Sequence, residues 1–321
     1  MSFSGMRKKI CGTFEEVTGN LFPMMIFDFR LHVFHTVARR LSFTRAAEEL
    51  FITQPAVTKH IRALEQQLAV KLLERQGNSV VLTEGGRVLL NYARKIEGLY
   101  SNLEEDIHAL SGMVKGRLSI GASTTIAQYL LPEMLAAFSQ RHPEVSLHII
   151  TGNTEQIEQA MRAGDIDLGF IEGNTRNRQL KYIPFRKDEI VLVGKAGHRL
   201  STVKTLRPAD LQNASFVMRE QGSGTLAIVM QALKKAGISG AQLPVVLHLD
   251  STEAIKSYLL HSDSLAFIST YAVQGTPAGL FSIVPVKGLR IERPLNAIHL
   301  QGTPTRMAAL FLKFALSYNQ K

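Results

Sequence analysis

Apolar residues recur at intervals of three and four along residues 27–68, the spacing that places them on one face of an α-helix. The pattern predicts three short helices around one core, formed by Phe27, Leu31, Phe34, Ala38, Leu41, Ala46, Ala47, Leu50, Val57, Ile61, Leu64 and Leu68. Thr53 stands where a helix N-cap belongs, and Pro55 suits the first turn of the third helix. The last two helices, joined by a tight turn, are typical of a helix-turn-helix.

The polar side of the third predicted helix carries side chains that suit DNA. Gln54, Thr58 and Lys59 can contact base edges, with Ala56 beside them, and nearby arginines suit phosphates. The candidate DNA contacts are Arg45, Thr53, Gln54, Pro55, Ala56, Thr58, Lys59, Arg62 and Arg75. An ordinary helical hairpin with a polar surface would show a similar pattern, so this segment alone leaves that alternative open.

Residues 72–82 predict a β-wing beside these helices. Leu72–Arg75 and Ser79–Leu82 are the expected strands, and residues 76–78 form the turn between them. Over residues 28–95, 11 Lys and Arg stand against 6 Asp and Glu. A module with this positive balance would neutralise phosphates and favour binding to nucleic acid.

A long helix is predicted from Glu84, with Thr83 as its cap. Its apolar stripe is close to a heptad seam and comprises Leu89, Tyr92, Ile96, Leu99, Leu103, Ile107 and Leu110. An isolated helix would leave this stripe in water, so we expect it to pair with a second copy of the chain. The alternative is that the stripe packs on the core of its own chain. Residues 111–116 then end the helix and form a hinge.

From Arg117 onward, strand patterns alternate with helical patterns. The predicted strands are Leu118–Ile120, Val145–Ile150, Leu168–Ile171, Ile190–Val193, Phe216–Met218, Val245–Leu249, Leu265–Ile268 and Ala297–Leu300. The predicted helices are Thr125–Arg141, Thr154–Ala163, Thr225–Ala236, Thr252–Leu260 and Thr305–Tyr318. This alternation predicts an α/β fold with parallel sheets, long enough for two small lobes with a cleft between them.

Polar loops that start helices follow several of these strands. They are Gly121–Thr125, Gly152–Thr154, Glu220–Thr225 and Leu249–Thr252. In open parallel sheets, ligands bind at the carboxyl ends of the strands, where helix N-termini and hydroxyl groups attract anions. Each Ser or Thr would also serve as a plain N-cap, which is the alternative for any single loop. Together the loops predict a site for a small anion.

Composition restricts the class of protein. A chain of 321 residues with 45% hydrophobic and 20% charged residues suits two or three globular domains. No apolar run is long enough to span a membrane, and residues 1–24 make a poor signal peptide, so we expect a cytoplasmic protein without a membrane partner. The net charge of +10 suits DNA, and the mildly basic second half suits either an anionic ligand or a solvated surface.

The sequence contains no recognisable catalytic or metal-binding constellation. Cys11 is its only cysteine, which excludes an intramolecular disulfide. It has no phosphate-binding P-loop, no nucleophile elbow and no His-Glu-x-x-His motif. His32 and His35 lie at helical spacing, but no carboxylate spacing completes a metal site. We therefore expect no enzyme, no cofactor and no metal centre.

The chain resembles the LysR-type transcriptional regulators from about Met25 to its C-terminus. The most specific stretches are Ser42–Leu50, with the sequence SFTRAAEEL, and Thr53–Thr58, with the sequence TQPAVT. The second half is similar to family members that control sulfur assimilation and carbon fixation. The stretches that carry this similarity are Gly121–Thr125, Gly152–Thr154, Gly169–Gly173, Arg219–Thr225 and Ser251–Lys256.

The resemblance implies four segments. They are an N-terminal extension (1–24), a winged helix-turn-helix domain (25–83), a linker and dimerisation helix (84–112) and an effector-binding domain (113–321). The two α/β lobes of that domain, expected at 117–189 with 294–321 and at 190–293, would resemble type 2 periplasmic binding proteins. Met24 or Met25 as the initiator is the alternative to a genuine extension. Two departures from the family pattern are Leu73, where a Phe is usual, and His261–Ser264, in place of a Gly-rich turn.

The resulting hypothesis is a transcriptional regulator controlled by a small anionic effector. The candidate effector-binding residues are Ser123, Thr124, Thr125, Gly152, Asn153, Thr154, Glu172, Arg219, Gly222, Ser223, Gly224, Thr225, Ser251 and Thr252. The family implies further partners: promoter DNA, other copies of the chain in a dimer or tetramer, and RNA polymerase. Two rivals are an architectural DNA-binding protein without an effector, and a solute-binding protein or enzyme built on the two lobes.

Overall fold

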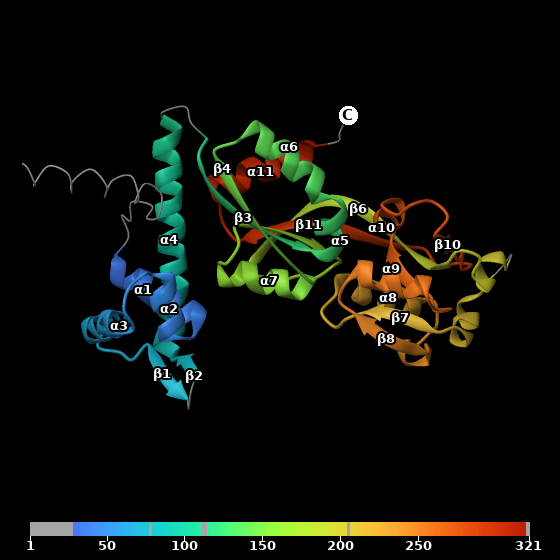
Figure 1. Ribbon diagram of the computed structural model, residues 1–321, viewed down its shortest axis with the longest axis horizontal. Coiled ribbons are helices and arrows are strands. Elements are labelled where there is room, and N and C mark those ends of the chain that lie inside the picture. The colour runs from blue at the N-terminus through green and yellow to red at the C-terminus, as the bar shows by residue number, and fades with distance from the viewer. Residues whose placement is uncertain (1–27, 77–78, 111–113, 204–205, 319–321) are drawn as a thin grey trace, which may run out of the picture. The chain divides into compact units, whose positions relative to one another are not determined.

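A computed structural model describes residues 28–76, 79–110, 114–203 and 206–318 of the chain. They form two compact units that divide between Glu104 and Glu105 (Figure 1). The elements of the first unit are α1 (Phe29–Arg40), α2 (Phe43–Glu49), α3 (Gln54–Leu68), β1 (Leu73–Gln76), β2 (Ser79–Leu82) and most of α4 (Glu84–Leu110). The three helices, the wing and the long helix predicted from the sequence are all present.

Side-chain caps set where the first three helices begin. Thr53 accepts a hydrogen bond from the backbone N–H of Ala56 at 3.4 Å, and Pro55 lies in the first turn of α3. Asp28 and Ser42 cap α1 and α2 in the same way. Each cap satisfies an N–H group that a helix leaves unpaired at its start. The cap predicted at Thr53 is therefore confirmed.

The core of the first unit follows the predicted apolar spacing, with two exceptions. Its members include Val33, Phe34, Val37, Ala38, Ala46, Ala47, Leu50, Val57, Ile61 and Leu64. Leu41 and Leu68 were predicted in this core, but they are 47% and 44% exposed. Leu41 has a left-handed φ of 47°, and Ala69, which follows Leu68, has a φ of 52°. The chain therefore leaves the helical period at both residues. Phe27 lies outside the described residues.

Glu65 attaches the wing, in which β1 and β2 pair antiparallel, to α3. Its buried carboxylate accepts hydrogen bonds from the N–H groups of Leu72 (2.9 Å) and Leu73 (3.4 Å) and from the Lys71 ammonium (2.9 Å). Burial alone would raise the pKa of Glu65, but these donors hold it below its usual value. Leu73, the departure from the family pattern, is 9% exposed and belongs to the core.

The helix α4 has two apolar faces. Leu90 and Ala93 are buried, and Thr83 caps the helix by accepting a hydrogen bond from the N–H of Gly86 at 2.9 Å. Large apolar side chains between 44% and 66% exposed lie along α4: Val88, Tyr92, Leu99, Leu103 and Ile107. Leu89 was predicted in this stripe, but it packs on the core of its own chain. The exposed stripe therefore runs from Tyr92 to Ile107, at intervals of seven, four and four.

The second unit contains one large sheet in the order β10-β6-β11-β5-β3-β4, with β9 also pairing with β6. Its strands are β3 (Gly116–Ser123), β4 (Val145–Gly152), β5 (Leu168–Glu172), β6 (Leu180–Lys195), β9 (Ala266–Ser269), β10 (Phe281–Ile283) and β11 (Ile291–Leu300). A separate parallel pair comprises β7 (Phe216–Arg219) and β8 (Val245–Leu249).

Helices cover these strands. They are α5 (Thr124–Tyr129), α6 (Leu131–Arg141), α7 (Thr154–Ala163), α8 (Gly224–Lys235), α9 (Thr252–Leu260), α10 (Thr270–Gln274) and α11 (Arg306–Ser317). Short 3₁₀ helices span Arg199–Thr202, Pro208–Asn213 and Gly240–Gln242. Among the described helices, none is both long enough and apolar enough to cross a membrane.

Two long strands depart from the predicted topology. β3, β4 and β5 are parallel as expected, but β11 runs antiparallel to both β5 and β6. β6 and β11 are also much longer than the segments predicted at Ile190–Val193 and Ala297–Leu300. The sequence missed their polar parts because those parts are ordered by backbone pairing and show no apolar pattern. Both strands contribute to two separate cores, so they connect the two lobes.

Alternate residues of the central strands face opposite layers of helices. Phe170 of β5 packs with α6 and α11, whereas its neighbour Ile171 packs with α7. Figure 1 shows α6 and α11 on one side of the sheet and α7 on the other. In the second lobe, Phe216 of β7 packs with α8, and Val217 packs with α9. The two-lobed α/β architecture expected from the sequence is confirmed.

Candidate functional site

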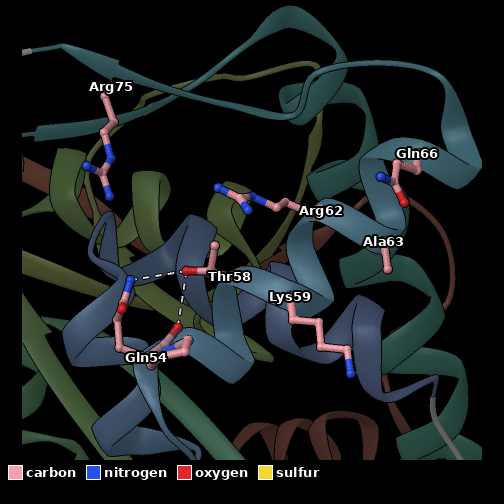
Figure 2. A pocket seen from close by; sticks show the side chains of 8 residues that line it. Gln54, Thr58, Lys59, Arg62, Ala63, Gln66 and Arg75 are labelled. Atoms are coloured by element: carbon pink, nitrogen blue, oxygen red, sulfur yellow. Dashed lines mark hydrogen bonds between the residues drawn. The ribbon is translucent and has the colours of Figure 1, made fainter.

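In the first unit, the polar face of α3 and strand β1 form a groove of about 590 Å³ (Figure 2). Its lining residues are Gln54, Pro55, Thr58, Lys59, Arg62, Ala63, Gln66 and Arg75. Six of these were predicted from the sequence. Arg45, Thr53 and Ala56 were predicted as well but do not line the groove. Ala63 and Gln66 were missed, although each lies one helical turn beyond a predicted residue of the same face.

The groove is positively charged and partly preorganised. Lys59, Arg62 and Arg75 contribute three cations, and no acidic residue is among those that line it. The side-chain amide of Gln54 donates a hydrogen bond to the Thr58 hydroxyl at 3.1 Å (Figure 2). That hydroxyl donates in turn to the backbone carbonyl of Gln54 at 3.1 Å. These bonds hold the amide on the exposed face of α3. Cations and an oriented amide are the groups that contact DNA phosphates and base edges.

In the second unit, the lobes meet around Arg293 of β11, the largest fully buried side chain of the described residues. Its Nε and Nη2 contact the carboxylate of Asp188 at 2.7 and 2.6 Å. Its Nη1 donates to the Glu172 carboxylate and, at 2.6 Å, to the Thr225 hydroxyl. A further bond from Nη2 reaches the Thr125 hydroxyl at 3.2 Å. Four hydrogen bonds and one further ion-pair contact thus engage all three nitrogens of the guanidinium.

Glu172 collects the donors that were predicted to bind an anion. Its carboxylate accepts hydrogen bonds from the hydroxyls of Ser123 and Thr225, both at 2.9 Å, and from the N–H of Thr125 at 3.1 Å. Complete burial would raise the pKa of Glu172, but the charges of Arg293 and Arg219 and these donors hold it below its usual value. The carboxylate is therefore ionised at neutral pH.

Several other predicted residues cap helices. Ser223 and Ser251 accept hydrogen bonds at the starts of α8 and α9, and Asn153 forms a capping box with Gln156 at the start of α7. The hydroxyl of Thr154 donates to the backbone carbonyl of Glu172 at 3.1 Å. Thr252 is buried at the start of α9. The alternative of plain N-capping accounts for the side-chain bonds of Ser223 and Ser251, and for the bonds between Asn153 and Gln156.

Loops from the two lobes touch beside this network. The Asn153 amide donates to the Gln221 carbonyl at 3.3 Å, and the Glu155 N–H donates to the Gly222 carbonyl at 3.3 Å. Gly222 has a φ of +86°, which favours glycine. At Gly224, an added Cβ would overlap the carbonyl oxygen of Glu172. These glycines allow the start of α8 to approach the first lobe closely.

Arg219 lies at the edge of the same region. Its side chain is 4% exposed, and its Nε donates to Glu220 at 2.8 Å. Its Nη2 donates to the Thr124 hydroxyl at 3.1 Å and to Glu220 at 3.2 Å. The Thr124 hydroxyl donates in turn to the Gly152 carbonyl at 3.4 Å. The structure thus brings Thr124, Gly152 and Arg219 together at the ends of three strands.

A second polar contact between the lobes was not predicted. The Tyr129 hydroxyl of α5 donates to Glu253 of α9, and the Lys256 ammonium reaches Glu253 at 2.8 Å. Lys256, Arg293 and Asp188 lie in segments whose pattern suggested only a helix or a strand end. A single charged residue carries no signal that distinguishes burial from exposure. Among the described residues, no group of His, Cys, Asp and Glu could hold a metal ion.

Comparison with known proteins agrees with both halves of this description. Residues 29–87 match the bacterial regulatory helix-turn-helix protein, lysR family, and residues 111–320 match the LysR substrate binding domain. The HTH-type transcriptional regulator CysL of Bacillus subtilis is 32% identical over 276 residues, which cover 86% of this chain and 91% of CysL. The RuBisCO operon transcriptional regulator of Allochromatium vinosum is 32% identical over 290 residues, covering 90% and 95% of the two chains.

A solved structure shares the fold of the second unit. The regulatory domain of CcmR from Synechocystis, in complex with 2-PG, superposes with a TM-score of 0.60 and 25% identity. It covers 64% of this chain and 99% of that domain.

A winged helix-turn-helix followed by a two-lobed effector-binding domain defines a DNA-binding transcriptional regulator, not an enzyme. The chain belongs to the LysR family, as the sequence resemblance predicted. Its similarity to CysL and to the RuBisCO regulators also confirms the predicted likeness to the sulfur and carbon-fixation members.

Substitutions in the groove should separate base contacts from phosphate contacts. We expect Gln54→Ala and Lys59→Ala to weaken binding to the preferred promoter sequence by about 1–3 kcal/mol and to relax its specificity. Arg62→Ala should weaken binding to all DNA sequences alike and make the affinity depend less on the salt concentration. Gln67→Ala, on the exposed face of α3 outside the groove, is the control. Fluorescence anisotropy with specific and scrambled duplexes measures these effects, and unchanged specificity in both alanine variants would contradict the assignment.

Removing the buried guanidinium should destabilise the second unit strongly. Arg293→Met leaves the carboxylates of Glu172 and Asp188 unpaired, so we expect a loss of about 3–5 kcal/mol near pH 7 in urea unfolding. Arg290→Met, at a side chain 74% exposed, should change stability by less than about 0.5 kcal/mol.

The pH dependence has a definite sign. Folding lowers the pKa of Glu172 below its usual value of 4.5. Its carboxylate therefore contributes fully to the free energy of unfolding above pH 4.5, and this contribution is lost as the pH falls through the folded-state pKa. Acidification should therefore narrow the stability gap between the wild type and Arg293→Met. A gap that widens, or that never exists, would show that the ion network does not stabilise the fold.

Proposed function

We propose that the groove on α3 reads promoter DNA from the major groove, within a domain spanning residues 25–83. Base edges are contacted by Gln54, Thr58 and Lys59, with Thr53, Pro55 and Ala56 close to the duplex. Arg45, Arg62 and Arg75 contact phosphates. The observation that supports this most directly is that three cations, and no acidic residue, are among the side chains that line the groove. The protein acts in the cytoplasm, where bacterial promoters lie.

The chain assembles through α4, within a linker segment spanning residues 84–112. The support is the exposed stripe of Tyr92, Leu99, Leu103 and Ile107, whose spacing is that of a coiled-coil seam. An exposed apolar stripe on one helix is stabilised when a second copy covers it. Dimers formed in this way pair further into tetramers, and the bound assembly contacts RNA polymerase.

The effector-binding domain, residues 113–321, binds a small anionic effector between its two lobes. These lobes are residues 117–189 with 294–321, and residues 190–293. The support comes from Arg219, Thr124 and Gly152, which converge at the ends of three strands, the usual ligand position in α/β sheets. The similar regulatory domain of CcmR forms a complex with 2-PG, and several curated relatives are RuBisCO regulators. Small sulfur or phosphate oxyanions and phosphorylated carboxylates are therefore the effector class.

Charges placed in the α4 stripe should disrupt assembly. We expect Leu99→Asp with Leu103→Asp to reduce the oligomeric state, because pairing would bury unpaired carboxylates. Asn91→Asp, at an exposed polar residue of the same helix, is the control for added charge. Analytical ultracentrifugation of the full chain measures the outcome. An unaltered assembly in the double variant would place the main interface elsewhere.

Calorimetric titration tests the effector class. The full chain is titrated with sulfate, thiosulfate, inorganic phosphate and phosphoglycolate, and we expect at least one of them to bind. Thr124→Val should weaken that binding about tenfold or more, because the hydroxyl lies on the guanidinium of Arg219. Thr202→Val, at an exposed hydroxyl of the 3₁₀ helix Arg199–Thr202, should leave the Kd unchanged. Binding of no anion would favour an effector-independent DNA-binding protein.

A further inference from the structure

The buried cations at the junction of the lobes are already neutralised by carboxylates of the chain. Each of the three buried cations described there is paired: Arg219 with Glu220, Lys256 with Glu253, and Arg293 with both Glu172 and Asp188. These four carboxylates and three cations carry a net charge of −1. An effector anion added to the cluster would be repelled unless a carboxylate moved away from its cation.

In two of the three cations, every nitrogen is already engaged by the fold. All three guanidinium nitrogens of Arg293 are engaged inside the fold, by four hydrogen bonds and a further ion-pair contact with Asp188. The three donors of the Lys256 ammonium reach Glu253 at 2.8 Å, the Tyr129 hydroxyl at 3.4 Å and the Ala272 carbonyl at 3.4 Å. An anion that bound either cation would have to displace one of these internal contacts.

Arg219 is different because part of its guanidinium is uncommitted. Its Nε and Nη2 donate to Glu220 and Thr124, while its Nη1 has no hydrogen-bond partner within the described part of the chain. An arginine fork binds planar and tetrahedral oxyanions through pairs of parallel N–H bonds. Arg219 therefore has both the geometry and the spare donors to bind an anion beside Thr124.

Glu220 is the carboxylate whose departure would free Arg219, since Glu253, although its side chain is 52% exposed, bonds to Lys256 and Tyr129. The side chains of Glu172 and Asp188 are 2% and 0% exposed and accept bonds from several segments. The side chain of Glu220 is 21% exposed, and among the described residues its carboxylate bonds only to Arg219. A rotation of this one side chain toward solvent would open the fork of Arg219 without disturbing the Arg293 network.

We propose that Glu220 is an internal competitor for the effector site, occupying the fork of Arg219 until an oxyanion displaces it. This inference rests on the proposed anionic effector. The exchange replaces one anion by another on the same guanidinium, so a monovalent oxyanion preserves the charge of the buried cluster and a divalent one adds a single negative charge to it. Competition of this kind multiplies the apparent affinity for the anion by the fraction of molecules in which Glu220 has left the fork. It would set the effector concentration at which the regulator responds.

The test compares Glu220→Gln with Glu144→Gln in the full chain. Both variants lose one negative charge, but Glu144 lies exposed on the turn before β4. Calorimetric titrations with sodium sulfate and inorganic phosphate at constant ionic strength give the Kd values. We expect Glu220→Gln to bind about tenfold more tightly than the wild type, because the neutral amide competes weakly for the guanidinium. Glu144→Gln should remain within about twofold of the wild type.

Each outcome decides the proposal. Tighter binding by Glu220→Gln alone supports it, including the case in which the wild type shows no measurable binding. Equal or weaker binding by Glu220→Gln, with binding by the wild type, overturns the competitor role and leaves the anionic effector intact. Absence of binding in every protein overturns both. Arg219→Gln in the Glu220→Gln background should abolish the binding, with its thermal unfolding measured beside it to confirm folding.

Discussion

A guanidinium with no contact to solvent must be fully matched by carboxylates and acceptors, and at Arg293 this requirement determines how the second unit is assembled. Its bonds reach Glu172 at the end of β5, Asp188 on β6, Thr125 on α5 and Thr225 on α8. A buried charge that loses its partner is costly, so these segments must keep their positions together. The long strands β6 and β11 pass through both lobes and carry two members of the network, which ties the lobes to one ion cluster.

This constraint changes how the effector site is understood. Hydroxyls and a helix N-terminus that would suit an external anion are already bound to Glu172, an anion supplied by the chain itself. We therefore propose that recognition takes place at the edge of the cluster, where Arg219 bonds to Thr124 and to Glu220. In this proposal, the interior of the cluster stabilises the fold and its edge binds the ligand. The DNA-binding unit shows a similar division, because Glu65 holds the wing internally while Lys59 faces the groove.

Local patterns predicted what depends on local physics. The helices, the Thr53 cap and the wing follow from apolar spacing and capping chemistry, and the groove residues follow from the polar face of one helix. Leu41 was misplaced because spacing does not show where a left-handed residue ends a helix. The antiparallel β11 and the role of Arg293 depend on contacts between residues more than a hundred positions apart, for which one sequence carries no signal. The strand-end loops are present, but the hydroxyls of Ser123 and Thr225 bond to the chain's own Glu172, and Ser223 and Ser251 cap helices.

Thermodynamic linkage tests the central claim that an anion bound between the lobes controls DNA binding. The Kd of the full chain for its preferred promoter duplex is measured with and without a saturating anion, and the Kd for that anion is measured with and without the duplex. The account predicts that both affinities change by the same factor, on the order of 5–150-fold, because coupling between two sites is reciprocal. Tight binding of both ligands with no mutual effect would contradict it.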